Sequence, residues 1–129
     1  MKLLLDTSAF LWYLSGDAKL PKPVVSAVRS PENEVWLSAV SLWEVVVKHQ
    51  LGKLPLPAAP SSYIPKQRER HAIDPLPLEE RAIVHLPKLP AHHRDPFDRM
   101  LICQSIEHEM LLVTSDPRIL EYPVKTFWG

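Results

Sequence analysis

The sequence predicts an α/β fold in which short strands alternate with helices around a mainly parallel sheet. Two patterns along the chain carry this prediction. Short continuous apolar runs are typical of strands buried on both faces, and the segments between them space their apolar residues as helices do. The chain has 129 residues, of which 46% are hydrophobic and 23% charged. This is the size and composition of one soluble domain, which we expect to span residues 1–129.

The first expected strand is the apolar run at residues 2–5, which ends at Asp6. Thr7 and Ser8 follow it directly, and hydroxyl side chains are favoured at the start of a helix. We therefore expect Thr7 and Ser8 to cap a short helix that continues to Leu14.

The next part of the chain is expected to hold two helices and a strand. A helix is expected over residues 21–30, with proline near its start. Residues 34–37 have the pattern of a second strand. Ser38 is the expected N-cap of a long apolar helix that runs to about Leu51. Gly52 is expected to end that helix, as glycine commonly does.

The middle of the chain is rich in proline. Fourteen residues are proline, and seven of them lie between residues 55 and 87. Because proline fixes φ and has no N–H, we expect only short helices between turns there. The expected elements from here on are a helix over 63–71, a weak strand over 72–76, a helix over 78–86, a helix over 96–108, a strand over 110–113 and an edge strand over 124–127.

Charge and composition exclude several classes of protein. Lys plus Arg and Asp plus Glu number 15 each, so the formal net charge is zero, unlike a basic nucleic-acid-binding tail or an acidic disordered chain. No apolar run approaches the roughly 18 residues of a membrane span, and the start of the chain does not resemble a signal peptide. The single cysteine, Cys103, cannot form an internal disulfide. A cytoplasmic location is therefore expected.

Four acidic residues occupy conspicuous positions in the expected elements. Asp6 and Asp116 each follow a strand, Glu44 lies within a strongly apolar helix, and Asp98 lies in the first turn of another helix. Carboxylates that converge need a proton or a cation between them, and an oxygen-only donor set suits Mg²⁺ or Mn²⁺. Such a metal site can activate water for attack on a phosphodiester. If a bound cation neutralises these four acids, 11 acids and 15 basic residues remain elsewhere. This surplus of positive charge favours binding of a polyanion.

Each acid also has a purely structural interpretation. Asp6 is a possible cap of the helix that follows it. Glu44 is placed to pair with Lys48 one helical turn later, and Asp116 before Pro117 is an ordinary turn residue. Asp95, directly before Pro96, is favourable as an N-cap, so its role as helix cap or site acid stays open.

At these residues the chain resembles the PIN-domain family, and more narrowly the VapC-type toxin ribonucleases of type II toxin–antitoxin systems. The likeness covers essentially the whole chain. Its strongest part is the stretch His93-Arg94-Asp95-Pro96-Phe97-Asp98-Arg99. The segments that carry the likeness are 3–8, 38–44, 93–104 and 112–116.

This resemblance implies a three-layer α/β/α sandwich and Mg²⁺- or Mn²⁺-dependent cleavage of RNA. It also implies a homodimer and a cognate antitoxin protein that blocks the site. By position, the acidic quartet of the family corresponds to Asp6, Glu44, Asp98 and Asp116, which are expected to bind the metal and to be catalytic. Asp6, Asp98 and Asp116 would hold the metal, while Glu44 would bind it through water or orient the attacking water. The alternative is a catalytically silent RNA-binding or scaffold module of the same fold.

Further residues are expected around the quartet or elsewhere. Those expected beside the site or at the substrate are Thr7, Ser8, Asp95, Ser115 and Arg99. His92 and His93 are interpreted as loop or RNA-contacting residues, since hard cations prefer oxygen. Cys103 is expected to be a buried small apolar residue. Trp12, Trp36 and Trp43 are expected in the core or at an interface, with Trp12 as a candidate antitoxin contact.

Overall fold

The computed structural model describes residues 1–91 and 94–129, so the interpretation of His92 and His93 lies outside the described residues. Five strands form one parallel sheet in the order β3-β2-β1-β4-β5. The strands are β1 (Lys2–Leu5), β2 (Glu34–Ser38), β3 (Asp74–Leu76), β4 (Leu111–Val113) and β5 (Thr126–Phe127). The helices are α1 (Thr7–Ser15), α2 (Lys22–Arg29), α3 (Ala39–Gln50), α4 (Pro60–Arg70), α5 (Glu80–Ile83) and α6 (Pro96–His108), with a 3₁₀ turn at Leu86–Lys88.

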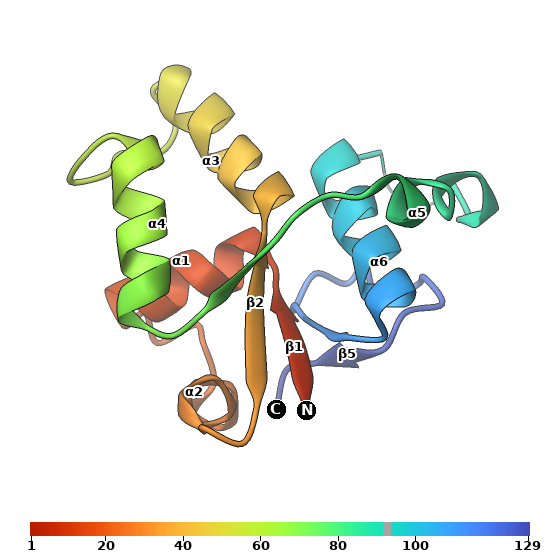
Figure 1. Ribbon diagram of the computed structural model, residues 1–129, viewed down its shortest axis with the longest axis horizontal. Helices are drawn as coiled ribbons and strands as arrows, with labels where there is room; N and C mark the ends of the chain where they lie inside the picture. The colour runs from red at the N-terminus through yellow and green to blue at the C-terminus, as the bar shows by residue number, and fades with distance from the viewer. Residues whose placement is uncertain (92–93) are drawn as a thin grey trace.

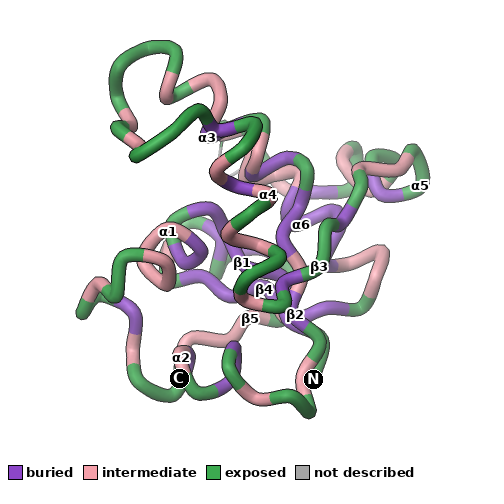
Figure 2. Tube along the Cα trace, turned by 60° about the vertical axis from the view of Figure 1, so that its left-hand side comes forward, coloured by how far each residue is buried: buried purple, intermediate pink, exposed green. Residues whose placement is uncertain are grey.

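Helices cover both faces of this sheet, so the predicted α/β/α sandwich is confirmed (Figure 1). Side chains alternate across the central strand β1. Leu3 and Leu5 pack with residues of α1, α2 and α4 on one face, whereas Leu4 packs with residues of α6 on the other. Buried residues accordingly run through the middle of the molecule, while the segment after α3 is largely exposed (Figure 2).

The order of the strands leaves a switch point beside β1. The chain proceeds from β1 to β2 and β3 on one side, and then returns to place β4 on the other side of β1. The backbone N–H of Asp6 donates to the carbonyl of Val113 at 3.1 Å, so the ends of β1 and β4 are joined. In parallel sheets, ligands bind beyond the carboxyl ends of the strands at such a point.

The start of α1 differs from the expected one. The cap is Asp6, whose carboxylate accepts from the backbone N–H of Ala9, and Thr7 and Ser8 are the first helical residues. Thr7 and Ser8 therefore do not cap this helix, and the alternative interpretation of Asp6 as its cap is confirmed. Asp6 is the better cap because its side-chain oxygen reaches the free N–H groups of the first turn from the extended residue before the helix.

The long helix α3 begins and ends as predicted. Ser38 is its N-cap, with its hydroxyl accepting from the N–H of Val40 at 2.9 Å. Leu51 is its C-cap, and Gly52 follows with a φ of 70°, a conformation that is strained for other residues.

The proline-rich middle holds a longer helix than expected. Helix α4 begins at Pro60, before the expected start at residue 63, and it continues through Pro65 over 11 residues. Pro60 suits the first turn, where a backbone N–H would have no partner within the helix, so the missing N–H costs nothing. Pro65 deprives only the carbonyl of Ser61 of a bond, and Ser61 is exposed to water. The helix expected over 78–86 is shorter, since α5 covers only Glu80–Ile83 and a 3₁₀ turn follows.

Burial tests the expectation for Cys103 and half of the expectation for Trp43. Cys103 is fully buried in α6, as expected. Trp43 was expected in the core or at an interface; it is 53% exposed on α3, which excludes the core and leaves the interface as a prediction. None of the helices in the described ranges is long and apolar enough to cross a bilayer.

Candidate active site

A cavity of about 540 Å³ opens beyond the carboxyl ends of β1 and β4, at the switch point of the sheet. Its wall comes from α1, α3, the start of α6 and the loop after β4. The four predicted acids all line it, although up to 110 residues separate them along the chain. The acids on its wall are Asp6, Glu44, Asp95, Asp98 and Asp116, and Thr7, Ser8, Trp12, Lys48, Ser115, Pro117 and Arg118 complete it.

Asp6 is the most strongly perturbed acid in this cavity. Only 8% of the residue is exposed, and burial raises the pKa of its carboxyl from 3.8 to about 6, with the negative charges of Asp98 and Glu44 adding to the rise. Hydrogen bonds from the hydroxyl of Thr114 and the N–H of Ala9 act in the opposite direction and lower this pKa. At neutral pH, Asp6 is therefore mostly ionised, and its buried negative charge destabilises the fold. A bound cation would relieve this destabilisation.

Glu44 lies on the buried side of α3 and is held by two neighbours. The hydroxyl of Thr7 donates to Oε1 at 2.7 Å, and Nζ of Lys48 donates to Oε2 at 2.5 Å. Thr7 Oγ1 also lies 2.9 Å from Oγ of Ser41, which shares the polar side of α3 with Glu44. The bond to Glu44 raises the pKa of Lys48. Glu44 therefore has both expected properties: it pairs with Lys48, and it faces the cavity.

Asp95 and Asp98 reach the cavity from the start of α6. One oxygen of Asp95 accepts from the N–H groups of Phe97 and Asp98, at 2.9 and 3.2 Å, so Asp95 is the N-cap of α6. Asp98 occupies the first turn, where the helix dipole favours an acid. Asp95 therefore caps α6, as one of its two interpretations predicted, and the same side chain also lines the cavity.

Asp116 is fixed by the turn that follows β4. Its Oδ1 accepts from the backbone N–H of Arg118 at 2.9 Å, and the guanidinium of Arg118 donates to both of its oxygens, at 3.3 and 3.1 Å. The N–H of Asp116 in turn donates to the hydroxyl of Thr114 at 3.1 Å. Asp116 is therefore a turn residue, as its sequence position suggested, and its carboxylate also faces the cavity.

The chemistry of the cavity fits a hard divalent cation. Its acidic side chains offer only oxygen atoms. Five carboxylates and two cationic side chains line it, leaving three negative charges in excess. Within residues 1–91 and 94–129, no three His, Cys, Asp or Glu side chains stand close enough together to enclose a metal ion. The donors thus share one cavity without forming a ready-made cage.

Most of the other predicted residues lie where they were expected. Thr7, Ser8 and Ser115 line the cavity. Arg99 does not, and its charge instead acts on the thiol of Cys103. Thr114 was missed, although it is the first hydroxyl residue after β4 and touches both Asp6 and Asp116. Its position directly after the strand was the available signal.

An acidic cavity at the switch point of a parallel sheet suits proteins that perform metal-assisted chemistry on anionic substrates. The family model of the PIN domain matches residues 3–125, and the chain belongs to this family. It is also 36% identical over 58 residues to Ribonuclease VapC16 of Mycobacterium tuberculosis (strain ATCC 25618 / H37Rv). That match spans 45% of this chain and 41% of the relative, so less than half of the relative's length is compared.

Solved structures share the fold at low sequence identity. One is a chain in the crystal structure of VapBC2 from Rickettsia felis, a complex bound to a DNA fragment from its promoter. It has a TM-score of 0.72 at 13% identity, with 98% of this chain and 96% of that chain covered. A chain of VapBC-1 from nontypeable Haemophilus influenzae has a TM-score of 0.68 at 18% identity, with 98% and 97% covered. A chain of a toxin–antitoxin complex from Klebsiella pneumoniae has a TM-score of 0.52 at 19% identity, with 88% and 86% covered.

Proposed function

We propose that this chain is a divalent-metal-dependent endoribonuclease and the toxin of a toxin–antitoxin pair. The observation that carries the proposal is the convergence of Asp6, Glu44, Asp98 and Asp116 on one cavity at the switch point of the sheet. Membership of the PIN domain family and the similarity to a protein named Ribonuclease VapC16 support it. So does the shared fold with chains of VapBC complexes.

We assign each acid a role that agrees with how its side chain is held. Asp6, Asp98 and Asp116 would hold Mg²⁺ or Mn²⁺ directly, while Glu44, fixed by Thr7 and Lys48, would bind the ion through the attacking water and so orient that water. A bound divalent ion activates water and stabilises the negative charge that develops on a phosphodiester. Cleavage would leave a 3′-hydroxyl and a 5′-phosphate. Arg118, exposed at the rim beside Asp116, would contact the RNA backbone.

The proposed partners are RNA, a cognate antitoxin protein and a second copy of the chain, in the cytoplasm. An apolar groove of about 390 Å³ adjoins the acidic cavity, and Trp12 lines both of them. The groove lies between α1 and the segment before α4, where its apolar wall includes Leu11, Leu14, Leu54, Leu56 and Tyr63. An antitoxin that covers this groove would also close the entrance to the acids.

Replacing Trp12 with alanine is expected to weaken antitoxin binding by about tenfold to a hundredfold, because aromatic side chains often dominate such interfaces. Isothermal titration calorimetry with the protein encoded by the neighbouring gene measures this change. Trp43→Ala is the matched control, since Trp43 is exposed on α3 and does not line the groove. Unchanged affinity in Trp12→Ala, or an equal loss in Trp43→Ala, would contradict the placement of the antitoxin.

The proposed activity is tested by inducing the chain in cells with and without its neighbouring gene, and by mapping new RNA 5′ ends. Induction alone should arrest growth and produce new 5′-phosphate ends, and the neighbouring gene should relieve the arrest. Asp98→Asn is expected to produce neither effect. New RNA ends that persist in Asp98→Asn would show that another nuclease makes them.

A further inference from the structure

A polar side chain, Gln104, lies in the apolar layer between α6 and the sheet. It is completely buried, beside Leu101, Ile102 and Cys103 of the same helix. Its oxygen accepts from the hydroxyl of Ser38 at 2.5 Å, and its nitrogen donates to the carbonyl of Pro77 at 3.3 Å. A buried amide is costly unless it is hydrogen-bonded, and an apolar side chain of this size would fill the same space. Packing alone therefore does not explain why a glutamine occupies this buried position.

Ser38 makes this contact significant for the active site. It is the last residue of β2 and the N-cap of α3, and it is 1% exposed. A serine hydroxyl can donate one hydrogen bond and accept others. The Ser38 hydroxyl accepts from Val40 N–H and donates to Gln104. The atom that fixes the start of α3 is thus also the atom that ties α3 to α6.

The spacing along the two helices links this bond to the catalytic acids. Ser38 lies six residues before Glu44, and Gln104 lies six residues after Asp98. At 1.5 Å per residue, each acid stands roughly 9 Å along its helix from the shared bond. The two helices contact each other and run in opposite directions, α3 away from the carboxyl end of the sheet and α6 back toward the sheet (Figure 1).

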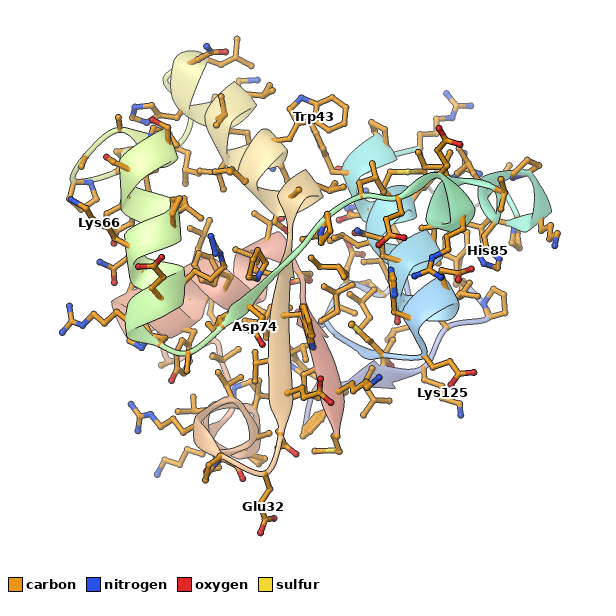
Figure 3. All side chains as sticks on the ribbon, viewed as in Figure 1. Glu32, Trp43, Lys66, Asp74, His85 and Lys125 are labelled. Carbon is orange, nitrogen blue, oxygen red and sulfur yellow. The ribbon has the colours of Figure 1, made fainter. Side chains whose placement is uncertain are left out.

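A second contact joins the same two helices at the level of the acids. The rings of Trp43 and Phe97, which directly precede Glu44 and Asp98, meet edge to face with centroids 4.8 Å apart. Trp43 projects from α3 toward the outer end of α6 (Figure 3). This contact is exposed, whereas the Ser38–Gln104 bond is buried and shielded from water. The buried bond is therefore the more rigid determinant of how far apart the two helices stand.

We propose that Gln104 is a positioning residue whose bond to Ser38 sets the gap between α3 and α6, and so the gap across which Glu44 and Asp98 hold the metal. The inference rests on the proposed function, because it assigns Gln104 a role only if these acids bind a divalent ion. Gln104 touches neither metal nor substrate in this role and acts entirely through the placement of the two helices.

The test is a double-mutant cycle on metal affinity, measured with Mn²⁺ alone by isothermal titration calorimetry on the full chain. Gln104→Met keeps the length of the side chain and removes both hydrogen bonds. It is expected to weaken Mn²⁺ binding about tenfold, the lower end of effects from groups that orient metal ligands. In Glu44→Gln, where the positioned acid is already lost, the same substitution is expected to weaken binding by less than about threefold, because coupled sites are not additive.

A purely structural role for Gln104 predicts different results. Ile102→Val, also fully buried in α6, is the control for lost packing and is expected to leave Mn²⁺ affinity within about twofold of wild type. The inference is overturned if Gln104→Met binds Mn²⁺ like wild type, loses equally in both backgrounds, or loses no more than Ile102→Val. Should Gln104→Met not fold, Gln104→Leu removes the same two bonds and leaves Ser38 in place as the cap of α3. A wild-type chain that neither binds Mn²⁺ nor cleaves RNA would instead refute the proposed function.

Discussion

Asp6→Asn is expected to reduce RNA cleavage by roughly a thousandfold, because a bound metal supplies several kcal/mol of charge stabilisation. The same variant is expected to make the metal-free protein more stable at neutral pH. The pKa of Asp6 rises from 3.8 to about 6 on folding, mainly through burial. The folded chain therefore binds this proton more tightly than the unfolded chain, and stability falls as the pH rises from about 4 to above 6. The ionised carboxylate costs roughly 3 kcal/mol, at about 1.4 kcal/mol per pKa unit.

Asparagine removes that charge and keeps a side-chain oxygen for the N–H of Ala9, so α1 retains its cap. We expect a net gain of about 1–3 kcal/mol in the free energy of unfolding at pH 7.5, measured by urea titration in excess chelator. At pH 4 the wild-type side chain is largely neutral in the fold, and the difference should largely disappear. An Asp6→Asn protein that is less stable than wild type at pH 7.5 would contradict the electrostatic account of this site. Full activity in this variant would instead favour a silent RNA-binding module with a contaminating nuclease.

Removal of divalent ions is expected to abolish cleavage, and added Mg²⁺ or Mn²⁺ should restore it. The restored activity should depend on pH because a proton and the cation compete for Asp6. Because the pKa of Asp6 is about 6, few Asp6 side chains are protonated at pH 7.5, and protons compete little with the metal ion there. Below pH 6 we expect the apparent metal affinity to fall about tenfold per pH unit. Titration of the metal at pH 7.5, 6 and 5, with RNA cleavage followed at each concentration, measures this dependence.

Two outcomes would argue against this account. Cleavage that survives excess chelator would exclude a role for an exchangeable ion. Metal affinity that is constant between pH 7.5 and 5 would show that Asp6 does not lie among the groups that bind the ion. Arg118→Ala is a useful comparison because it changes a cation at the rim and removes none of the proposed ligands. Its pH dependence should follow that of wild type.

The positions of the four acids were predictable because each is marked by local pattern. Asp6 ends an apolar run, and parallel strands bring their carboxyl ends to one edge of a sheet. The partners of these acids were harder to foresee. The bonds of Thr7 to Glu44 and of Ser38 to Gln104 join residues 37 and 66 positions apart. Periodicity and composition carry no signal for such pairs, because they depend on how the helices pack.

The sequence suggested that each acid has either a structural or a chemical role, but in the structure one side chain can have a structural role and also line the cavity. Asp95 caps α6, Asp6 caps α1 and Glu44 pairs with Lys48, yet all three carboxylates line the cavity. A carboxylate has two oxygens with several lone pairs, so one side chain can accept a bond from a helix and still present an acceptor elsewhere. Pro65 is the converse case. Its effect on α4 depends on whether water can reach one carbonyl, which no local pattern reveals.

The central position of β1 has a consequence for how the molecule opens. Leu4 belongs to one apolar cluster and Leu3 and Leu5 to the other, so this strand cannot detach without disturbing both halves of the interior. Its amide hydrogens should therefore exchange with solvent only when the whole chain unfolds. Asp6, which follows this strand, stands on the part of the molecule least able to fray. Repulsion among the neighbouring carboxylates must then be relaxed by shifts of the surrounding helices, with the strand as the fixed point.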